Sequence, residues 1–243
     1  FMNPSHEMEV GALIKKIAPD CHVSLSSEVL PQIREYFRLS TTTVNAMIGP
    51  VLTRFLTKLA RQIDDDGIKT KQLYIMQCNG GVRTFGASSL ISVPMILSGP
   101  AAGLIAANQL ASAAGYKNVI SLDMGGTSCD IGLIENGMPS QINRGAIDKY
   151  DIAIPMLDIN TISAGGGTIA SVDKVGILRV GPTSAGADPG PVCYNIGGAE
   201  PTITDANLTL GFLNPDYFLG GRMKLNKEKA EKAIDEKIAG PLK

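Results

Sequence analysis

The spacing of hydrophobic residues predicts a helix-rich first part of the chain. The longest amphipathic run covers residues 44–63, where apolar side chains recur at intervals of three and four. This run predicts a long packed helix that begins at Ser40 or Thr41 and ends at the segment 64–67. Pro50 falls within the pattern, so we expect it to kink the helix or to move its start.

Shorter patterns predict the remaining elements. Helices are expected at residues 8–17, 26–36, 98–114 and 226–238, and around Leu208 and Leu210. Strands are expected at residues 23–25, 73–78, 119–122, 129–134, 150–154, 157–159 and 177–180. Asn136 and Gly137 are typical of a tight turn between two strands.

The order of these elements indicates an α/β protein. A strand, a helix and a second strand follow one another between residues 73 and 134, and glycine-rich segments come directly after strands. In α/β sheets, ligands gather at the carboxyl ends of the strands. We therefore expect a helix-rich part at residues 1–118, a β-rich part at residues 119–243, and a binding edge where the strands end.

The segment from Asp123 to Asp130 carries the strongest chemical signal. It places two carboxylates around a turn at Gly125 and Gly126, directly after the apolar run 119–122. A bare glycine turn can aim backbone N–H groups at an anion, and flanking carboxylates can hold the cation that accompanies a nucleotide phosphate. The apolar run predicts that Asp123 ends a buried strand, where a charge is costly unless it is paired or bound to metal. The alternative is that the two glycines only close a hairpin.

Other segments leave alternatives open. Residues 163–168 form a second glycine-rich loop, which either approaches an anion closely or makes a turn or bulge. Residues 181–191 contain too many glycines and prolines for regular structure, and they form either a binding loop or a rigid connection. Residues 204–207 are expected to cap the helix that contains Leu208 and Leu210, and the alternative is that Asp205 binds a ligand. The acidic residues 64–66 are expected to be a solvated helix end rather than a metal site.

Composition restricts the classes of function. Of the 243 residues, 44% are apolar and 19% are charged, which allows a substantial core in one large domain or two small ones. The net charge is −1, aromatic residues make up 5%, and tryptophan is absent. These values argue against a nucleic-acid binder and against a protein that binds anionic membranes. The uncharged segment between Arg83 and Lys117 is interrupted by prolines, glycines and serines, so it is not expected to cross a membrane.

The four cysteines are widely spaced and the chain has only two histidines. Neither a zinc site nor a disulfide framework is indicated, and we expect reduced thiols. The N-terminal residues are polar and do not resemble a signal peptide, so the expected compartment is the cytoplasm.

Several further motifs occur in a fixed order along the chain. They are Asn3-Pro4-Ser5-His6-Glu7, residues 24–29, Arg38 with residues 41–46, Met76 with Asn79-Gly80-Gly81, and residues 98–103, 123–127, 163–167, 186–191 and 204–207. In this series the chain resembles the hydantoinase A/5-oxoprolinase family. That family comprises nucleotide-binding parts of ATP-dependent amidohydrolases, and the acetone and acetophenone carboxylases are related to it.

The resemblance implies a fold and a place within it. The fold is that of the actin-like ATPases, related to ribonuclease H, in which two α/β lobes close over ATP and two glycine-rich hairpins hold the phosphates. The segment 123–130 is similar to the second hairpin, and the family's first hairpin does not occur in this sequence. The resemblance therefore implies that residues 1–243 are a central hydantoinase A-type domain from a longer chain, which contains only part of the fold and is not active in isolation.

The resemblance also implies roles for individual residues. Catalysis would begin with transfer of the γ-phosphoryl group of ATP to the carbonyl oxygen of a cyclic amide, hydantoin or 5-oxoproline, in a reaction that depends on positioning and charge neutralisation. Asp123 and Asp130 would be the catalytic carboxylates that hold Mg²⁺. The expected nucleotide-binding residues are Gly125, Gly126, Thr127, Ser128, Gly165, Gly166 and Gly167.

The implied partners are a small cyclic amide and a hydantoinase B-type subunit or domain that performs the hydrolytic step, and the full-length protein is expected to be an oligomer. Two alternatives stay open. One is a subunit of an ATP-dependent acetone or acetophenone carboxylase. The other is a non-catalytic actin-like module that regulates or assembles with a partner.

Overall fold

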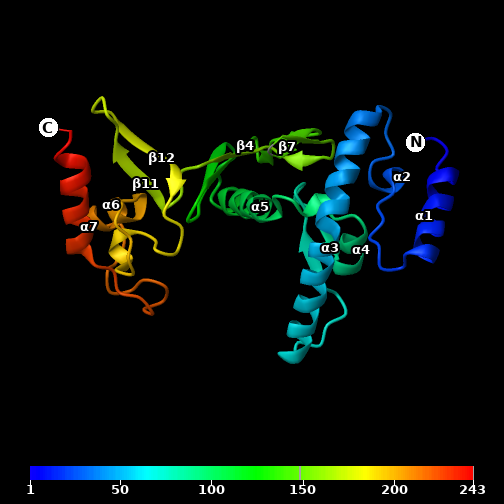
Figure 1. The fold of residues 1–243 in the computed structure, drawn as a ribbon, viewed down its shortest axis with the longest axis horizontal. Helices are drawn as coiled ribbons and strands as arrows, with labels where there is room; N and C mark the ends of the chain where they lie inside the picture. Colours follow the sequence, from blue (N-terminus) through cyan, green and yellow to red (C-terminus); the bar gives the residue numbers. More distant parts are fainter. Residues whose placement is uncertain (148, 243) are drawn as a thin grey trace. The chain divides into compact units, whose positions relative to one another are not determined.

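A computed structural model describes residues 1–147 and 149–242, and its chain folds into two compact units (Figure 1). The first unit contains Phe1–Ser121 and Gly132–Ile159, and the second contains Leu122–Ile131 and Asn160–Lys243. The division passes through one β-hairpin, whose tip belongs to the second unit. Within the described residues, no helix has the length and apolar character needed to cross a membrane.

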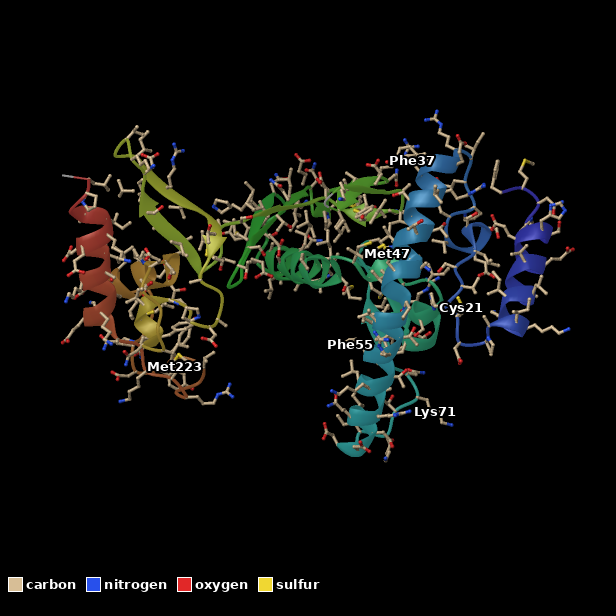
Figure 2. All side chains as sticks on the ribbon, viewed as in Figure 1. Cys21, Phe37, Met47, Phe55, Lys71 and Met223 are labelled. Atoms are coloured by element: carbon tan, nitrogen blue, oxygen red, sulfur yellow. The ribbon has the colours of Figure 1, made fainter. Side chains whose placement is uncertain are left out.

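The first unit is built mainly from helices. They are α1 (Ser5–Ile17), α2 (Ser26–Val29), α3 (Glu35–Asp65), α4 (Phe85–Leu90), α5 (Ser98–Ala113) and the 3-10 turn η1 (Val93–Met95). Met47 and Phe55 lie along α3, and Phe37 near its start has the Arg144 guanidinium 4.4 Å from its ring centroid (Figure 2). The predicted helices at 8–17 and 98–114 are confirmed.

The start of α3 differs from the prediction. The expected helix 26–36 ends at Val29, because the residue before a proline is disfavoured in the helical region and Pro31 follows Leu30. Helix α3 then begins at Glu35, before the expected caps, and it continues through Pro50. The expected strand at residues 23–25 is absent from the described structure.

Asn45 ties α3 to its neighbours inside the first unit. This fully buried side chain accepts hydrogen bonds from the backbone N–H groups of Ser92 and Val93, at 2.7 and 2.9 Å, and donates to Ser24 Oγ at 3.0 Å. The core around it includes Val29, Val44, Cys78, Val93, Ile152, Ile154 and Met156. A buried amide with its partners in place fixes the packing of these elements.

The strands form short antiparallel pairs and one larger sheet. The pairs are β1 (Tyr74–Met76) with β2 (Val82–Thr84), β6 (Gln141–Ile142) with β9 (Met156–Leu157), and β7 (Gly145–Ile147) with β8 (Tyr150–Ile152). The larger sheet has the order β10 (Ile159–Ile162), β4 (Cys129–Glu135), β3 (Val119–Met124), and β5 (Met138–Pro139) pairs with β4. Asn136 and Gly137 both have positive φ between β4 and β5, which confirms the predicted tight turn.

Strand β3 is more exposed than its apolar sequence predicts. Leu122 and Met124 are 70% and 51% exposed, and Asp123 is exposed as well. Because β3 is the edge strand of the order β10-β4-β3, it has a neighbouring strand on only one side. The expectation that Asp123 is a buried charge is therefore wrong.

The second unit joins a hairpin to three helical elements. It contains β11 (Thr168–Val172), β12 (Leu178–Ser184), the 3-10 turn η2 (Val192–Tyr194), α6 (Ile203–Thr209), α7 (Lys227–Ile234) and the π-helical turn η3 (Asp235–Ala239). Its core contains Cys193, Leu208, Leu225 and Ala230, and burial raises the pKa of the Cys193 thiol. Figure 1 shows α6 and α7 together in this unit. Strand β12 continues to Ser184, so the prediction that residues 181–184 lack regular structure is wrong.

Glu7 links α1 to α2 and supplies a testable dependence on pH. Its carboxylate accepts hydrogen bonds from Ser26 Oγ at 2.5 Å and from Ser27 N–H at 2.8 Å. The hydrogen bond from Ser26, followed by that from Ser27, lowers the pKa of Glu7 from 4.5 to about 2. Since the pKa of Glu7 is lower in the folded protein, its ionised carboxylate stabilises the fold fully above the unfolded pKa of 4.5. This contribution is lost as the pH falls through the folded pKa of about 2.

We expect a carboxyl NMR titration to place the pKa of Glu7 near 2, and we expect Ser26→Ala to raise it towards 4.5. A pKa of Glu7 that is the same in both proteins would contradict the role of Ser26.

Candidate functional site

The tip of the β3–β4 hairpin is held by a short backbone contact. Gly125 N–H donates to Ser128 O at 2.9 Å, which pairs these residues across the turn. Farther along the hairpin, Ser121 Oγ donates to Gly132 O at 3.3 Å in the same antiparallel register. Both contacts fit one antiparallel register without a bulge between them, and that register determines which residues face each other on the two strands.

Asp123 and Asp130 are directly opposite each other in this register. Asp130 Oδ1 accepts a hydrogen bond from Thr161 Oγ1 of β10 at 2.6 Å, whereas the Asp123 carboxylate has no hydrogen bond or ion pair with the described residues. Two like charges opposite each other destabilise an antiparallel pair. A bound cation would relieve this repulsion, so the hairpin offers two carboxylates to a metal ion.

The two carboxylates of the hairpin suit Mg²⁺ better than they suit a metal ion whose ligands all come from the protein. Among the described residues, no group of three or more His, Cys, Asp or Glu side chains is arranged to hold a metal ion. Magnesium keeps several waters and is commonly held by one or two carboxylates together with substrate phosphates. Asp123 and Asp130 meet that requirement, and the exposure of Asp123 leaves room for the ligands that the protein does not supply.

The glycine loop 165–167 packs against the hairpin tip. Gly166 N–H donates to Gly125 O at 2.9 Å, and Gly167 N–H donates to Gly126 O at 2.7 Å. The segments 123–130 and 163–168, which the sequence singled out separately, therefore meet within the second unit. Direct contact of Gly165–Gly167 with a nucleotide stays a prediction, because the two amides described here donate to the hairpin.

These hydrogen bonds set the direction of the amides at the tip. In a trans peptide the N–H points opposite to the C=O. The carbonyls of Gly125 and Gly126 both point to the glycine loop, so the N–H groups of Gly126 and Thr127 both point away from it. Within the described residues, the N–H groups of Gly126, Thr127 and Ser128 make no hydrogen bond to protein. Neighbouring amides that point the same way form an anion-binding concavity.

The space around Gly165 and Gly126 shows that these two glycines have different roles. A Cβ at Gly165 would lie 2.4 Å from Thr127 N and 2.5 Å from Ser128 N, so only glycine fits there without moving the hairpin. A Cβ at Gly126 would meet nothing within 4 Å, and its φ is not positive. Neither packing nor backbone conformation requires glycine at position 126. Its open space is therefore available to a ligand.

Asp205 anchors helix α6, the second element that contacts the glycine loop 165–167. This fully buried carboxylate accepts hydrogen bonds from the N–H groups of Val192, Cys193 and Thr202 and from Thr202 Oγ1. Thr202 Oγ1 in turn accepts from Asp205 N–H in a capping box. The prediction that residues 204–207 cap this helix is therefore wrong in position, because the N-cap is Thr202 and these residues lie within α6; Asp205 takes part in the cap as the third residue of the helix.

The structure adds two residues that sequence reasoning missed. Thr161 is the partner of Asp130, and Thr204 binds the carbonyl of Gly166. Thr204 belongs to one of the ordered motifs, which indicates its importance, but no sequence pattern indicates its contact with Gly166. Nothing in the sequence around Thr161 distinguishes it.

Comparison with known proteins gives a consistent group of relatives. The family model described as Hydantoinase/oxoprolinase matches residues 38–243. The caprolactamase subunit alpha of Pseudomonas jessenii is 45% identical over 240 residues, which are 99% of this chain and 34% of that protein.

Two solved structures are similar to the chain as well. A crystal structure of ATP-dependent caprolactamase from Pseudomonas jessenii has a TM-score of 0.75 and 41% identity, covering 99% of this chain and 35% of that one. A nucleotide-free structure of acetone carboxylase, solved to explain the mechanism of ATP-dependent acetone carboxylation, has a TM-score of 0.78 and 31% identity, covering 99% of this chain and 34% of that one. The chain thus spans about a third of the length of these relatives, and the predicted α/β fold class is confirmed.

Proposed function

Because the chain belongs to the hydantoinase/oxoprolinase family, we propose that it is the phosphate-holding part of an ATP-dependent enzyme that hydrolyses a cyclic amide such as hydantoin or 5-oxoproline. The observation that carries the proposal is the pair of amides at Gly126 and Thr127, which point the same way beside two opposed carboxylates. ATP use is supported by the ATP-dependent caprolactamase and acetone carboxylase structures that the chain resembles.

The reaction needs activation because an unstrained amide resists attack by water. Transfer of the γ-phosphoryl group to the carbonyl oxygen makes that carbon reactive towards water. Water adds to the carbon, the C–N bond of the ring breaks to leave an acyl phosphate, and a second water releases inorganic phosphate. One ATP and two waters thus give ADP, inorganic phosphate and the ring-opened product, which is an amino acid from 5-oxoproline and an N-carbamoyl amino acid from hydantoin. The requirement for the protein is to position the phosphates and to neutralise their charge.

Each residue of the hairpin has a role in this proposal. The N–H groups of Gly126, Thr127 and Ser128 donate to phosphate oxygens, and the carboxylates of Asp123 and Asp130 would hold Mg²⁺. When bound, the ion would supply charge neutralisation at the phosphates. Thr161 orients Asp130 through the 2.6 Å hydrogen bond. Gly125, Gly165, Gly166 and Gly167 keep the tip in the shape that binds.

A second subunit completes the proposed enzyme. The caprolactamase relative is named as a subunit alpha, so it works with at least one partner. We assign the hydrolytic step to a B-type subunit or domain, since the hairpin offers phosphate-binding amides and no nucleophile. The compartment proposed for the complex is the cytoplasm.

The proposal is tested by phosphate release from the full-length protein that carries this sequence, assayed with its partner subunit. We expect ATP to be consumed only when a cyclic amide is present, with hydantoin, 5-oxoproline and caprolactam compared. The ring-opened product of each amide is the matched control, because it lacks the bond to be broken. Phosphate release that is indifferent to all three amides would contradict the proposal.

The structural similarity to acetone carboxylase favours one other candidate, an ATP-dependent carboxylase subunit that uses the same phosphate grip. The two candidates differ in their co-substrate. Phosphate release that requires a ketone together with bicarbonate, and that no cyclic amide supports, would establish the carboxylase instead.

A further inference from the structure

Thr204 connects helix α6 to the glycine loop. Its backbone N–H and its Oγ1 both donate to the carbonyl oxygen of Gly166, each at 2.8 Å. The residue is only 8% exposed and lies one position before the fully buried Asp205. Asp205 and the cap residue Thr202 hold this end of α6 in place, so Thr204 acts from a fixed support.

The contact continues through two peptide groups to the tip of the hairpin. The carbonyl of Gly166 belongs to the peptide whose N–H is that of Gly167, and this N–H donates to Gly126 O at 2.7 Å. The carbonyl of Gly126 belongs in turn to the peptide whose N–H is that of Thr127. Each peptide is trans, so an acceptor on one side fixes the donor on the other.

The result is a hydrogen-bonded chain from the Thr204 hydroxyl to the Thr127 amide. In such a chain each bond polarises the next, which strengthens the last donor. The last donor is the Thr127 N–H, which makes no hydrogen bond to the described protein residues. The two hydrogen bonds that Thr204 donates to the Gly166 carbonyl therefore affect the direction of the Thr127 N–H and its strength as a hydrogen-bond donor. Thr204 itself makes no contact with this N–H in the chain of hydrogen bonds.

We propose that Thr204 is a positioning residue for phosphate binding, acting on the Thr127 amide through the Gly166–Gly167 and Gly126–Thr127 peptides. This inference rests on the proposed function, because it assigns the Thr127 amide to a phosphate of ATP. It adds to that function a residue outside the hairpin and predicts which kinetic constant depends on it.

The test compares Thr204→Val with Thr204→Ser in the full-length protein and its partner subunit. Valine keeps the shape and the backbone N–H but removes the hydroxyl, so we expect the KM for ATP to rise roughly three- to tenfold, the effect of one buried hydrogen bond. The KM for the cyclic amide should stay unchanged, and serine should restore the KM for ATP. If Thr204→Val impairs folding, Thr204→Ala takes its place, because alanine also lacks the hydroxyl and adds no buried methyl group at that position.

Thr209→Val is the matched control. Thr209 lies on the same helix, and its Oγ1 is buried and has no hydrogen-bond partner among the described residues, so loss of this hydroxyl should leave both KM values unchanged. Amide exchange supplies an independent readout, because the Gly167 N–H should exchange faster in Thr204→Val and at the original rate in Thr204→Ser.

Two results would overturn the inference. One is a KM for ATP in Thr204→Val equal to that of Thr209→Val, and the other is an equal rise in the KM for both substrates. Failure of the proposed function looks different, since turnover would then survive the loss of Asp123. An inactive Asp123→Ala variant beside an unaffected Thr204→Val variant would remove the role of Thr204 alone.

Discussion

Asp123→Ala is expected to abolish ATP-coupled turnover of the full-length protein, with a fall in kcat of at least about a hundredfold. Asp123 is exposed and faces Asp130 across the hairpin, and its carboxylate has no hydrogen bond or ion pair with the described residues. Its removal therefore breaks no internal contact and relieves a like-charge repulsion. The loss should lie in the holding of Mg²⁺ beside the phosphates, which stabilises the charge of the transition state.

The measurement combines phosphate release with thermal unfolding. We expect the melting temperature of Asp123→Ala to equal or exceed that of the wild type while turnover is lost. Asp216→Ala is the control, because this exposed carboxylate also belongs to the second unit but has only a 3.5 Å surface ion pair with Lys224. Full turnover in Asp123→Ala would exclude the hairpin carboxylates from the mechanism.

Gly165→Ala is expected to have the second-largest effect, for a different reason. The new Cβ would overlap backbone atoms of Thr127 and Ser128 at 2.4–2.5 Å, and backbone cannot rotate away as a side chain can. The loop and the hairpin tip must separate, which disturbs the hydrogen bonds from Gly166 and Gly167 to the tip. We expect a destabilisation of about 1–3 kcal/mol from this overpacking, together with loss of ATP binding.

Chemical denaturation and calorimetry with Mg-ATP measure these two effects separately. Gly126→Ala should lose ATP affinity without a change in unfolding free energy, because its Cβ enters open space. Gly86→Ala is the control for glycine replacement as such, since this helical site in α4 also has open space around it. Unchanged stability and affinity in Gly165→Ala would show that the loop does not support the hairpin.

Local sequence was a good guide to the hairpin and a poorer guide to its surroundings. The turn at Gly125–Gly126 and the tight turn at Asn136–Gly137 follow from short-range chemistry, and the structure contains both. The contact between Gly126 and Gly167 joins residues some forty positions apart, and a hydrogen bond between two backbones leaves no mark on residue type. The glycines showed only that close approach was permitted.

The errors have identifiable physical causes. Hydrophobic character predicted a buried β3, but Leu122 is 70% exposed, because apolar residues on an edge strand follow the same pattern as those inside a sheet. The prediction of a helix at residues 26–36 did not take Pro31 into account, although a proline at this position indicates that the helix ends before it. A cap near Asp205 could be predicted because a capping box is a local motif, but the cap was expected at residues 204–207 and lies at Thr202.

The paired carbonyls of Gly125 and Gly126 also determine which ions the tip can accept. Rotation of either peptide would turn a carbonyl oxygen outward and create a ligand for cations, but it would first have to break a hydrogen bond to the glycine loop. The hydrogen bonds to the glycine loop therefore hold both peptide groups in one orientation, with the N–H groups outward, before any ligand binds. Under the proposed function, this fixed orientation would favour negatively charged groups, and their binding would require no backbone rearrangement.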